Sequence, residues 1–299
     1  MKILNLGSLN IDKVYSIAHF VSAGETISST KMEIFSGGKG LNQSIALARA
    51  GAEVYHAGAI GNDGERLRRE LEAAGVDVRY LQTLNTVTGH AVIQLTPEGK
   101  NCIIISAGAN GEITCAYIDL VIEAFSPGDL LLLQNEISNV DYAIRKAKER
   151  GMKIALNASP IDEKLLCYPL ELVDYFLINE IEGSYLADMV SVQNRHEILR
   201  RLAEKFPNAA IVLTLGEEGV MYQYGQTVLE HGIYKVKAVD TTAAGDTFCG
   251  FFLAGVSKEK TAEECLQTAS MASAIAVSRK GAANSIPTID EVAGFARQI

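Results

Sequence analysis

The sequence has little of what marks several large classes of protein. Its 27 lysines and arginines are outnumbered by 36 aspartates and glutamates, and the formal net charge of −9 offers no basic field for a nucleic-acid backbone. No apolar run approaches the ~18 residues of a membrane span, and no signal peptide is recognisable before the first apolar segment. We therefore expect a cytoplasmic protein that binds neither nucleic acid nor membrane.

Cysteine and histidine are also scarce and scattered. The five cysteines are odd in number and form no C-x-x-C pair, which indicates reduced, mostly buried thiols. The five histidines lack His-x-x-x-His spacing, so we interpret them as structural or surface groups. With 299 residues, 48% of them hydrophobic, the chain can bury one large core, with or without a small appendage. Small-molecule chemistry is the favoured interpretation.

Short apolar segments alternate with helical patterns along most of the chain. Beyond a first strand near residues 3–6, strands are predicted at residues 54–60, 130–133, 153–156, 176–178, 211–215 and 236–239. Helices are predicted at residues 41–50, 63–74, 140–150, 180–188, 245–254 and 262–277. This alternation predicts an α/β fold in which helices cover both faces of a mainly parallel sheet.

Two strand-like segments, residues 14–35 and 89–105, interrupt this alternation. The second is typical of a hairpin that turns at residues 97–99. Together they could pair into one small sheet set over the strand ends as a lid. We therefore expect an α/β body of residues 1–12, 36–86 and 107–299, and a β lid of residues 13–35 and 87–106.

Residues 240–248 combine small side chains with an acid, Asp246, in the first turn of a predicted helix. The free N–H groups and the dipole of a helix N-terminus attract phosphate, and small residues let it approach the backbone. A carboxylate there indicates a base that takes a proton during phosphoryl transfer. An ordinary acid at a helix N-terminus explains the same spacing equally well.

Two glycine-rich segments fail the nucleotide-binding motifs that they resemble. In residues 33–40, Glu33 occupies the first glycine position of the Walker pattern and Gly40 its Ser/Thr position. Residues 58–64 are G-x-x-G-x-x-G rather than the dinucleotide pattern G-x-G-x-x-G. The glycines at residues 37–40 could still bring backbone close to a sugar or a phosphate, or they could form only a tight turn into a helix.

Polar side chains follow several predicted strands. They are Asn10, Asp12, Glu136, Asn179 and Glu182. Ligands of α/β proteins bind at the carboxyl ends of strands, and oxygen-bearing side chains suit sugar hydroxyls or hydrated Mg²⁺. Turn and helix-start preferences explain the same residues, so both interpretations stay open.

Taken in order, these segments resemble the ribokinase-like (PfkB) carbohydrate kinase family over nearly the whole chain. Residues 240–248 look like its second signature and residues 36–51 like its first, and the family's other segments follow in order at residues 7–12, 107–110, 179–182, 214–216 and 279–282. The resemblance implies a three-layer α/β sandwich with a mainly parallel central sheet of nine or so strands. It also implies a small β-sheet lid that serves as a dimer clasp.

The resemblance also implies site residues. The catalytic base would be Asp246, beside an anion hole of Ala243, Ala244 and Gly245. The sugar would be bound by Asn10, Asp12, Gly38, Lys39, Asn42 and Glu136. The nucleotide would be bound by Asn179, Glu182, Thr214 and Gly216, with Mg²⁺ held through water at Glu182. A monovalent cation would be bound by Asp240, Thr242, Ala276, Arg279, Gly281 and Ser285.

The implied reaction is transfer of the γ-phosphoryl group of ATP to O5 of D-ribose, giving ribose 5-phosphate, with Mg²⁺ and K⁺ as cofactors in a homodimer. Asn135 and the run at residues 158–160 depart from the family's usual residues and bear on which sugar is bound. The alternatives are a kinase for deoxyribose, fructose or a related ketose, and a non-catalytic sugar sensor on the same fold.

Overall fold

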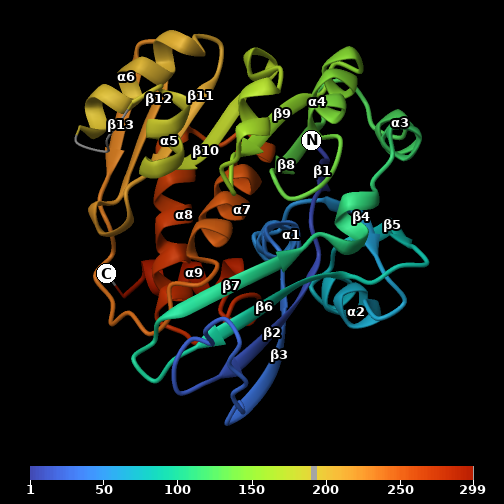
Figure 1. Cartoon of the computed structure of the whole chain (residues 1–299). Helices are drawn as coiled ribbons and strands as arrows, with labels where there is room; N and C mark the ends of the chain where they lie inside the picture. Colours follow the sequence, from blue (N-terminus) through green and yellow to red (C-terminus); the bar gives the residue numbers. More distant parts are fainter. Residues whose placement is uncertain (190–193, 299) are drawn as a thin grey trace.

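The computed structural model describes residues 1–189 and 194–298, and they form an α/β sandwich of three layers (Figure 1). The middle layer is a nine-stranded sheet in the order β13-β12-β11-β10-β9-β8-β1-β4-β5. Neighbours from β5 to β11 pair in parallel, while β12 and β13 add an antiparallel edge. The strands are β1 Ile3–Leu6, β4 Val54–Ile60, β5 Asp77–Thr83, β8 Leu130–Gln134, β9 Lys153–Asn157, β10 Tyr175–Asn179, β11 Ala210–Thr214, β12 Val220–Tyr224 and β13 Thr227–His231.

Helices bury both faces of this sheet, as its apolar strands predict. Successive residues of β1 point to opposite faces: Leu4 and Leu6 belong to one hydrophobic cluster and Ile3 to the other. The first cluster includes side chains of α3 Cys115–Glu123, α4 Val140–Glu149, α5 Glu180–Leu186 and α6 Arg195–Lys205. The second includes side chains of α1 Lys39–Arg49, α2 Glu65–Ala73, α7 Ala244–Ser257, α8 Ala262–Val277 and α9 Ile289–Ala296.

Two insertions pair into a second, four-stranded sheet, which confirms the predicted small sheet. Its order is β3-β2-β6-β7, with strands β2 Asn10–Ser16, β3 Lys31–Gly37, β6 Gly89–Leu95 and β7 Asn101–Ser106. The outer pairs are antiparallel and the central pair, β2 with β6, is parallel. This sheet extends from the body at the carboxyl end of β1 (Figure 1). Its strands cross the predicted boundaries at residues 12 and 36, and the division into body and lid stays a prediction.

Three sequence-based expectations are wrong in detail. Residues 236–239 form no strand, because the nearby backbone bonds, from the N–H groups of Val239 and Asp240, go to the Val277 carbonyl at the end of α8. Residues 17–30 form a loop, so the segment 14–35 is strand only at its two ends. The five cysteines are free, as expected, but only Cys249 and Cys265 are buried. Within the described residues no helix has the length and hydropathy needed to cross a membrane.

Candidate active site

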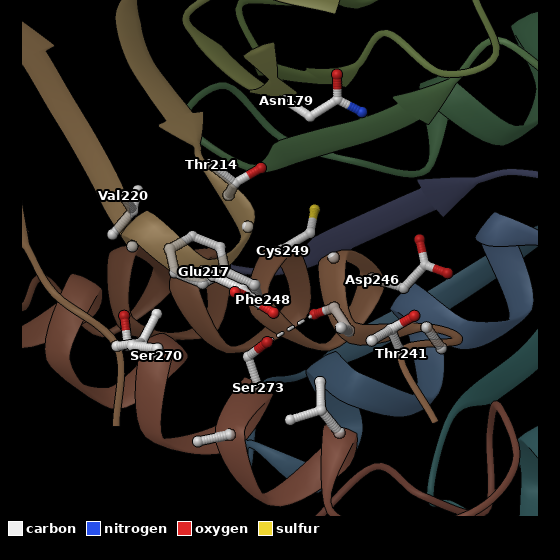
Figure 2. A pocket seen from close by; sticks show the side chains of 18 of the residues that line it. Asn179, Thr214, Glu217, Val220, Thr241, Asp246, Phe248, Cys249, Ser270 and Ser273 are labelled. Carbon is white, nitrogen blue, oxygen red and sulfur yellow. Dashed lines mark hydrogen bonds between the residues drawn. The ribbon is translucent and has the colours of Figure 1, made fainter. Parts of the chain in front are cut away.

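A pocket of about 760 Å³ lies where the strand ends of the central sheet meet the first turn of α7. Figure 2 shows Asn179 and Thr214 on one side of it, and Ser270 and Ser273 on the other. The Ser273 hydroxyl donates to the Ala244 carbonyl at 3.2 Å, which ties α8 to the start of α7. The pocket therefore has the position at which α/β proteins bind ligands, with a helix N-terminus as one wall.

The start of α7 is built to expose backbone N–H groups. Ala243 occupies the N-cap position in the left-handed conformation (φ 59°) and provides no side-chain cap, so the first turn stays uncapped. The N–H of Ala244 is partly engaged by the Thr241 carbonyl at 3.2 Å. At Gly245 nothing lies within 4 Å of an added Cβ, so a ligand has room to approach the backbone there. Gly245 is the most open of the three predicted anion-hole residues.

Asp246 lies in that first turn with only 8% of its surface exposed. The side-chain amide of Asn42 donates to its Oδ2 at 3.0 Å, and that of Gln43 donates to its Oδ1 at 2.8 Å. Both donors come from α1, so this helix fixes the plane of the carboxylate. Asp246 lines the pocket and is thus both held in place and accessible to a ligand.

Lys39 and Glu136 lie beside Asp246. The Lys39 backbone N–H donates to Glu136 Oε2 at 3.0 Å, and the Ser8 hydroxyl donates to the same oxygen. Burial raises the pKa of Glu136, and the nearby Asp246 charge raises it further. Burial works to lower the pKa of Lys39, but the surrounding carboxylates outweigh it and raise that pKa. Lys39 therefore stays a cation among acidic groups.

Asn10, Asp12 and Gly38 lie on the lid side of this cluster. The Asn110 side chain donates to Asn10 Oδ1 at 2.8 Å and fixes its direction. Burial, and then the Glu136 charge, raise the pKa of Asp12 to about 6. Gly38 has a φ of 93°, and an added Cβ would lie 2.9 Å from the Ser8 carbonyl oxygen, so only glycine fits.

The predicted sugar-binding residues divide between two places. Of the six, only Lys39 lines the pocket, while Asn10, Asp12, Gly38, Asn42 and Glu136 lie beyond its wall. Lys39 and Asp246 connect the two regions, through the Glu136 and Asn42 hydrogen bonds. A sugar held by the outer group would therefore meet a nucleotide in the pocket at Asp246.

The predicted nucleotide-binding residues Asn179, Glu182, Thr214 and Gly216 all line the pocket. Asn179 and Glu182 also form a capping box at the start of α5: Asn179 Oδ1 accepts the Glu182 N–H at 2.9 Å, and the Glu182 carboxylate accepts the Asn179 N–H at 3.0 Å. Asn179 and Glu182 therefore cap α5, as the helix-start interpretation predicts, and they also line the pocket.

The residues of the nucleotide side fit a hydrated Mg²⁺ ion. In residues 1–189 and 194–298 no three acidic, histidine or cysteine groups cluster as a metal cage. Mg²⁺ usually keeps several waters and takes one or two carboxylates together with substrate phosphates. Glu182 presents a buried carboxylate at the pocket wall on the nucleotide side, which fits such binding through water.

The two segments of the predicted cation site meet in space. The Gly281 N–H donates to Asp240 Oδ2 at 3.0 Å, while Asp240 Oδ1 accepts the N–H and hydroxyl of Thr242. The Arg279 N–H donates to the Ala276 carbonyl and the Arg279 side chain pairs with Glu291, so Arg279 could contribute only its carbonyl oxygen. Ser285 is fully buried nearby. Asp240 caps its turn, and the oxygen-rich surroundings also fit a large monovalent ion.

Several residues of the site carry no sequence signal of their own. Gln43 and Ser8 hold the carboxylates of Asp246 and Glu136, although neither stands out as a chemical group. The pocket is also lined by Val220 of β12 and by Ala274 and Val277 of α8. In the sequence these three are indistinguishable from ordinary core residues. The tertiary fold alone brings them to the site.

The fold and the site together are those of a phosphotransferase of the α/β class: a carboxylate at a helix N-terminus lies between a pocket at the strand ends and a cluster of buried polar groups. Residues 2–289 match the pfkB family of carbohydrate kinases, and the chain belongs to that family.

Known relatives cover nearly the whole chain. It is 34% identical to the ribokinase of Haemophilus influenzae over 302 residues, covering 97% of this chain and 96% of that protein. It is 30% identical to the deoxyribokinase of Salmonella typhi, with 97% of each chain covered. Its fold matches the structure of Arabidopsis thaliana ribokinase complexed with ribose and ATP, with a TM-score of 0.85, 29% identity, and 98% and 97% of the two chains covered.

Proposed function

We propose that this chain phosphorylates D-ribose at O5 with ATP, using Asp246 as the general base. The observation that carries the proposal is the position of the Asp246 carboxylate: it is held by two amides, lines the pocket and adjoins the open backbone of Gly245. A base and an anion-binding helix N-terminus at one point are what phosphoryl transfer to a hydroxyl requires. The ribokinase relatives support ribose as the acceptor.

The reaction follows from this geometry. The O5 oxygen of the sugar forms a bond to the γ-phosphorus, the bond from that phosphorus to the β–γ bridging oxygen breaks, and ADP leaves. The O5 proton passes to the Asp246 carboxylate. The backbone N–H groups at the start of α7 stabilise the negative charge on the transferring group, because they are already oriented before it arrives.

The pocket between β10, β11 and α8 would take ATP, with Mg²⁺ held through water at Glu182. Mg²⁺ would supply charge neutralisation between the β- and γ-phosphates. The protein's own contribution on this side is to line the pocket at Asn179, Thr214 and Gly216.

K⁺ is the proposed monovalent ion at the loop of Asp240 and Gly281. The hydrogen bond between Asp240 and Gly281 supports the proposal because it joins the two segments whose oxygens would hold the ion. The residues that follow Asp240 lead directly into Ala243 and Gly245. An ion there would stiffen the backbone that receives the phosphoryl group.

The identity of the sugar is the next part of the proposal. The deoxyribokinase relative makes deoxyribose the main alternative, followed by fructose or a related ketose, and then by a sensor without turnover. A coupled ADP-release assay over pentoses, hexoses and nucleosides tests all of them. We expect the highest kcat/KM with ribose. Turnover of another sugar alone would reassign the substrate, and thermal stabilisation by one sugar with no ADP release from any would favour the sensor.

The lid sheet, residues 13–35 and 87–106, is also proposed to close over the sugar and to join two subunits. Directly paired residues share a face, so Asp12, Phe35, Ala91 and Ile105 point to one side. Phe35 and Ile105 are 37% and 61% exposed there. Exposed apolar side chains next to a sugar-binding carboxylate favour contact with the lid sheet of a second subunit, which would bury them.

The cytoplasmic location of the protein stays a prediction.

A further inference from the structure

A row of polar side chains lies buried beneath the site, where a sheet and a helix would ordinarily pack apolar groups. Its members are completely excluded from solvent and come from β1, α1, β4 and β8: Asn5, Gln43, Ser44, His56 and Gln134. Burying so many polar groups is costly unless they bond one another, so the arrangement of their hydrogen bonds is informative.

Gln134 and Asp246 together fix the direction of these hydrogen bonds, because the Asp246 carboxylate can only accept. Its Nε2 donates to Asn5 Oδ1 at 2.9 Å and to Gln43 Oε1 at 2.8 Å, which uses both of its protons. Since Gln43 Oε1 is engaged as an acceptor, the other end of that amide must be Nε2. This Nε2 faces Asp246 and donates to its Oδ1 at 2.8 Å. A flipped Gln43 would place an oxygen against the carboxylate.

The second carboxylate oxygen of Asp246 is held by Asn42, whose Nδ2 donates to it at 3.0 Å. Two donors on opposite oxygens restrain rotation of the carboxylate about its own axis. A carboxylate oxygen accepts more than one hydrogen bond, so Oδ2 keeps capacity for a substrate hydroxyl. Gln43 does not line the pocket and is completely buried.

We propose that Gln43 is a positioning residue for Asp246, and that Gln134 acts through Gln43 by fixing the direction of its amide. This inference rests on the proposed role of Asp246 as the base. A base that is held before the sugar binds needs no reorientation in the transition state, and a small misplacement of a reacting group lowers the rate steeply.

The far end of the same row supplies a matched control. Asn5 Nδ2 donates to Ser44 Oγ at 2.8 Å, and Ser44 Oγ is hydrogen-bonded to His56 Nδ1, also at 2.8 Å. Burial lowers the pKa of His56 to about 3, which keeps the ring neutral. Ser44→Ala removes a buried hydrogen bond of the same network without touching Asp246 or Gln43.

The test compares Gln43→Met, Gln134→Met, their double variant and Ser44→Ala by kcat, sugar KM, pH profile and Tm. Gln43→Met should lower kcat by ~10- to 100-fold with sugar KM within about 2-fold. The acid limb of its kcat–pH profile should move to higher pH, because losing the Gln43 donor disfavours the ionised Asp246 carboxylate. The charged or titratable groups facing Asp246, which stay the same in these variants, are Lys39 on α1, Glu136 after β8 and Cys249 on α7.

The double variant should have a kcat no lower than that of Gln43→Met, since Gln134 is proposed to act only through Gln43. Ser44→Ala should lower Tm and leave kcat and the pH profile unchanged. If Ser44→Ala reduced kcat as much as Gln43→Met, the effect would belong to the fold and the inference would fall.

Asp246→Asn in the same experiment separates this inference from the proposed function. If Gln43→Met had the kcat and the pH profile of the wild type while Asp246→Asn was inactive, the inference would be overturned. The role of Asp246 as the base would stand. Wild-type kcat in Asp246→Asn would remove the proposed function itself. If Gln43→Met failed to fold, Gln43→Glu would replace it: this side chain keeps the acceptor for Gln134 but sets a carboxylate against Asp246, so an unchanged pH profile would overturn the inference.

Discussion

At the residue scale, the sugar side of the site concentrates negative charge. Glu136 and Asp246 lie close enough that the charge of Asp246 raises the pKa of Glu136, and Glu136 in turn raises that of Asp12. Lys39 is the cation among them. Such a cluster is less stable than a neutral one in the free protein, and a polyhydroxyl ligand would supply the donors that its carboxylates need.

Asp12 gives a prediction with a definite sign. Its pKa of about 6 in the folded chain exceeds the ~3.9 of an unfolded aspartate, so the folded state holds the extra proton between about pH 4 and pH 6, and stability falls as pH rises through that window. Asp12→Asn should therefore have a higher Tm than wild type at pH 7.5, a smaller advantage at pH 5, and a raised sugar KM. A Tm difference that does not change with pH would contradict the assignment.

Only part of the site could be predicted from single residues. Asp246 lies next to a glycine at the start of a predicted helix, so its position was readable in the sequence. Gln43 and Gln134 were not, because a neutral amide reveals its role only when β1, β8 and α1 bring its partners together.

At the element scale, the site depends on how closely α1 approaches α7. An added Cβ at Gly250 of α7 would lie 2.4 Å from the Ala46 Cβ of α1 and 2.8 Å from the Leu47 nitrogen. This contact sets the helix that carries Asn42 directly against the helix that carries Asp246. Gly250, about one turn along α7 from Asp246, is therefore part of the geometry of the base.

Gly250→Ala should push the two helices apart. We expect overpacking to lower the free energy of unfolding by about 1–3 kcal/mol and kcat to fall as the Asn42–Asp246 bond lengthens. Gly294→Ala in α9 is the matched control, since only the Arg297 side chain lies as near as 4.0 Å. It should be neutral or stabilising by up to about 1 kcal/mol. Thermal denaturation and kcat are measured for both variants. Equal changes in stability and in kcat would refute the packing argument.

The loop of residues 236–243, which leads into α7, gives the second prediction at this scale. If an ion holds this loop against Gly281, replacing Na⁺ with K⁺ at constant ionic strength should raise kcat/KM, and Asp240→Ala should abolish the difference. Asp240 also caps its own turn through Thr242, so the variant's Tm must be compared in both salts. Equal wild-type rates in Na⁺ and K⁺, at saturating Mg²⁺ and ATP, would leave capping as the whole role of Asp240.

Most strands in the middle of the central sheet could be predicted from the sequence, whereas the strands at its edges could not. The apolar segments at residues 54–60 and 153–156 are strands because a buried parallel sheet needs apolar residues on both faces. The strand-like segment at residues 236–239 also consists mainly of apolar residues, but it pairs with no neighbouring strand. Pairing is a tertiary property, and local pattern does not determine it.

At the scale of the whole molecule, the lid sheet leaves apolar side chains on both of its faces. Ile105 shares the face of Asp12, while Ile104 points to the other face, as successive residues of a strand do. The two are almost equally exposed, at 61% and 62%. They therefore form a matched pair for asking which face joins subunits.

Ile105→Glu should convert the expected dimer into a monomer at micromolar concentration, because a buried unpaired carboxylate opposes the interface. Ile104→Glu should leave the dimer intact. Mass in solution, measured by light scattering, distinguishes the two. A wild-type monomer would refute the clasp, and dissociation by Ile104→Glu alone would assign the interface to the opposite face.

The most direct test of the account compares wild type with Asp246→Asn in the ribose-dependent release of ADP. The substitution keeps the size of the side chain and removes the base, so we predict a fall in kcat of ~10²- to 10⁴-fold with ribose affinity nearly intact. Ribose affinity, measured separately by calorimetry, shows that the variant is folded and binds. A variant with near-normal kcat would contradict the role of Asp246 and the mechanism built on it.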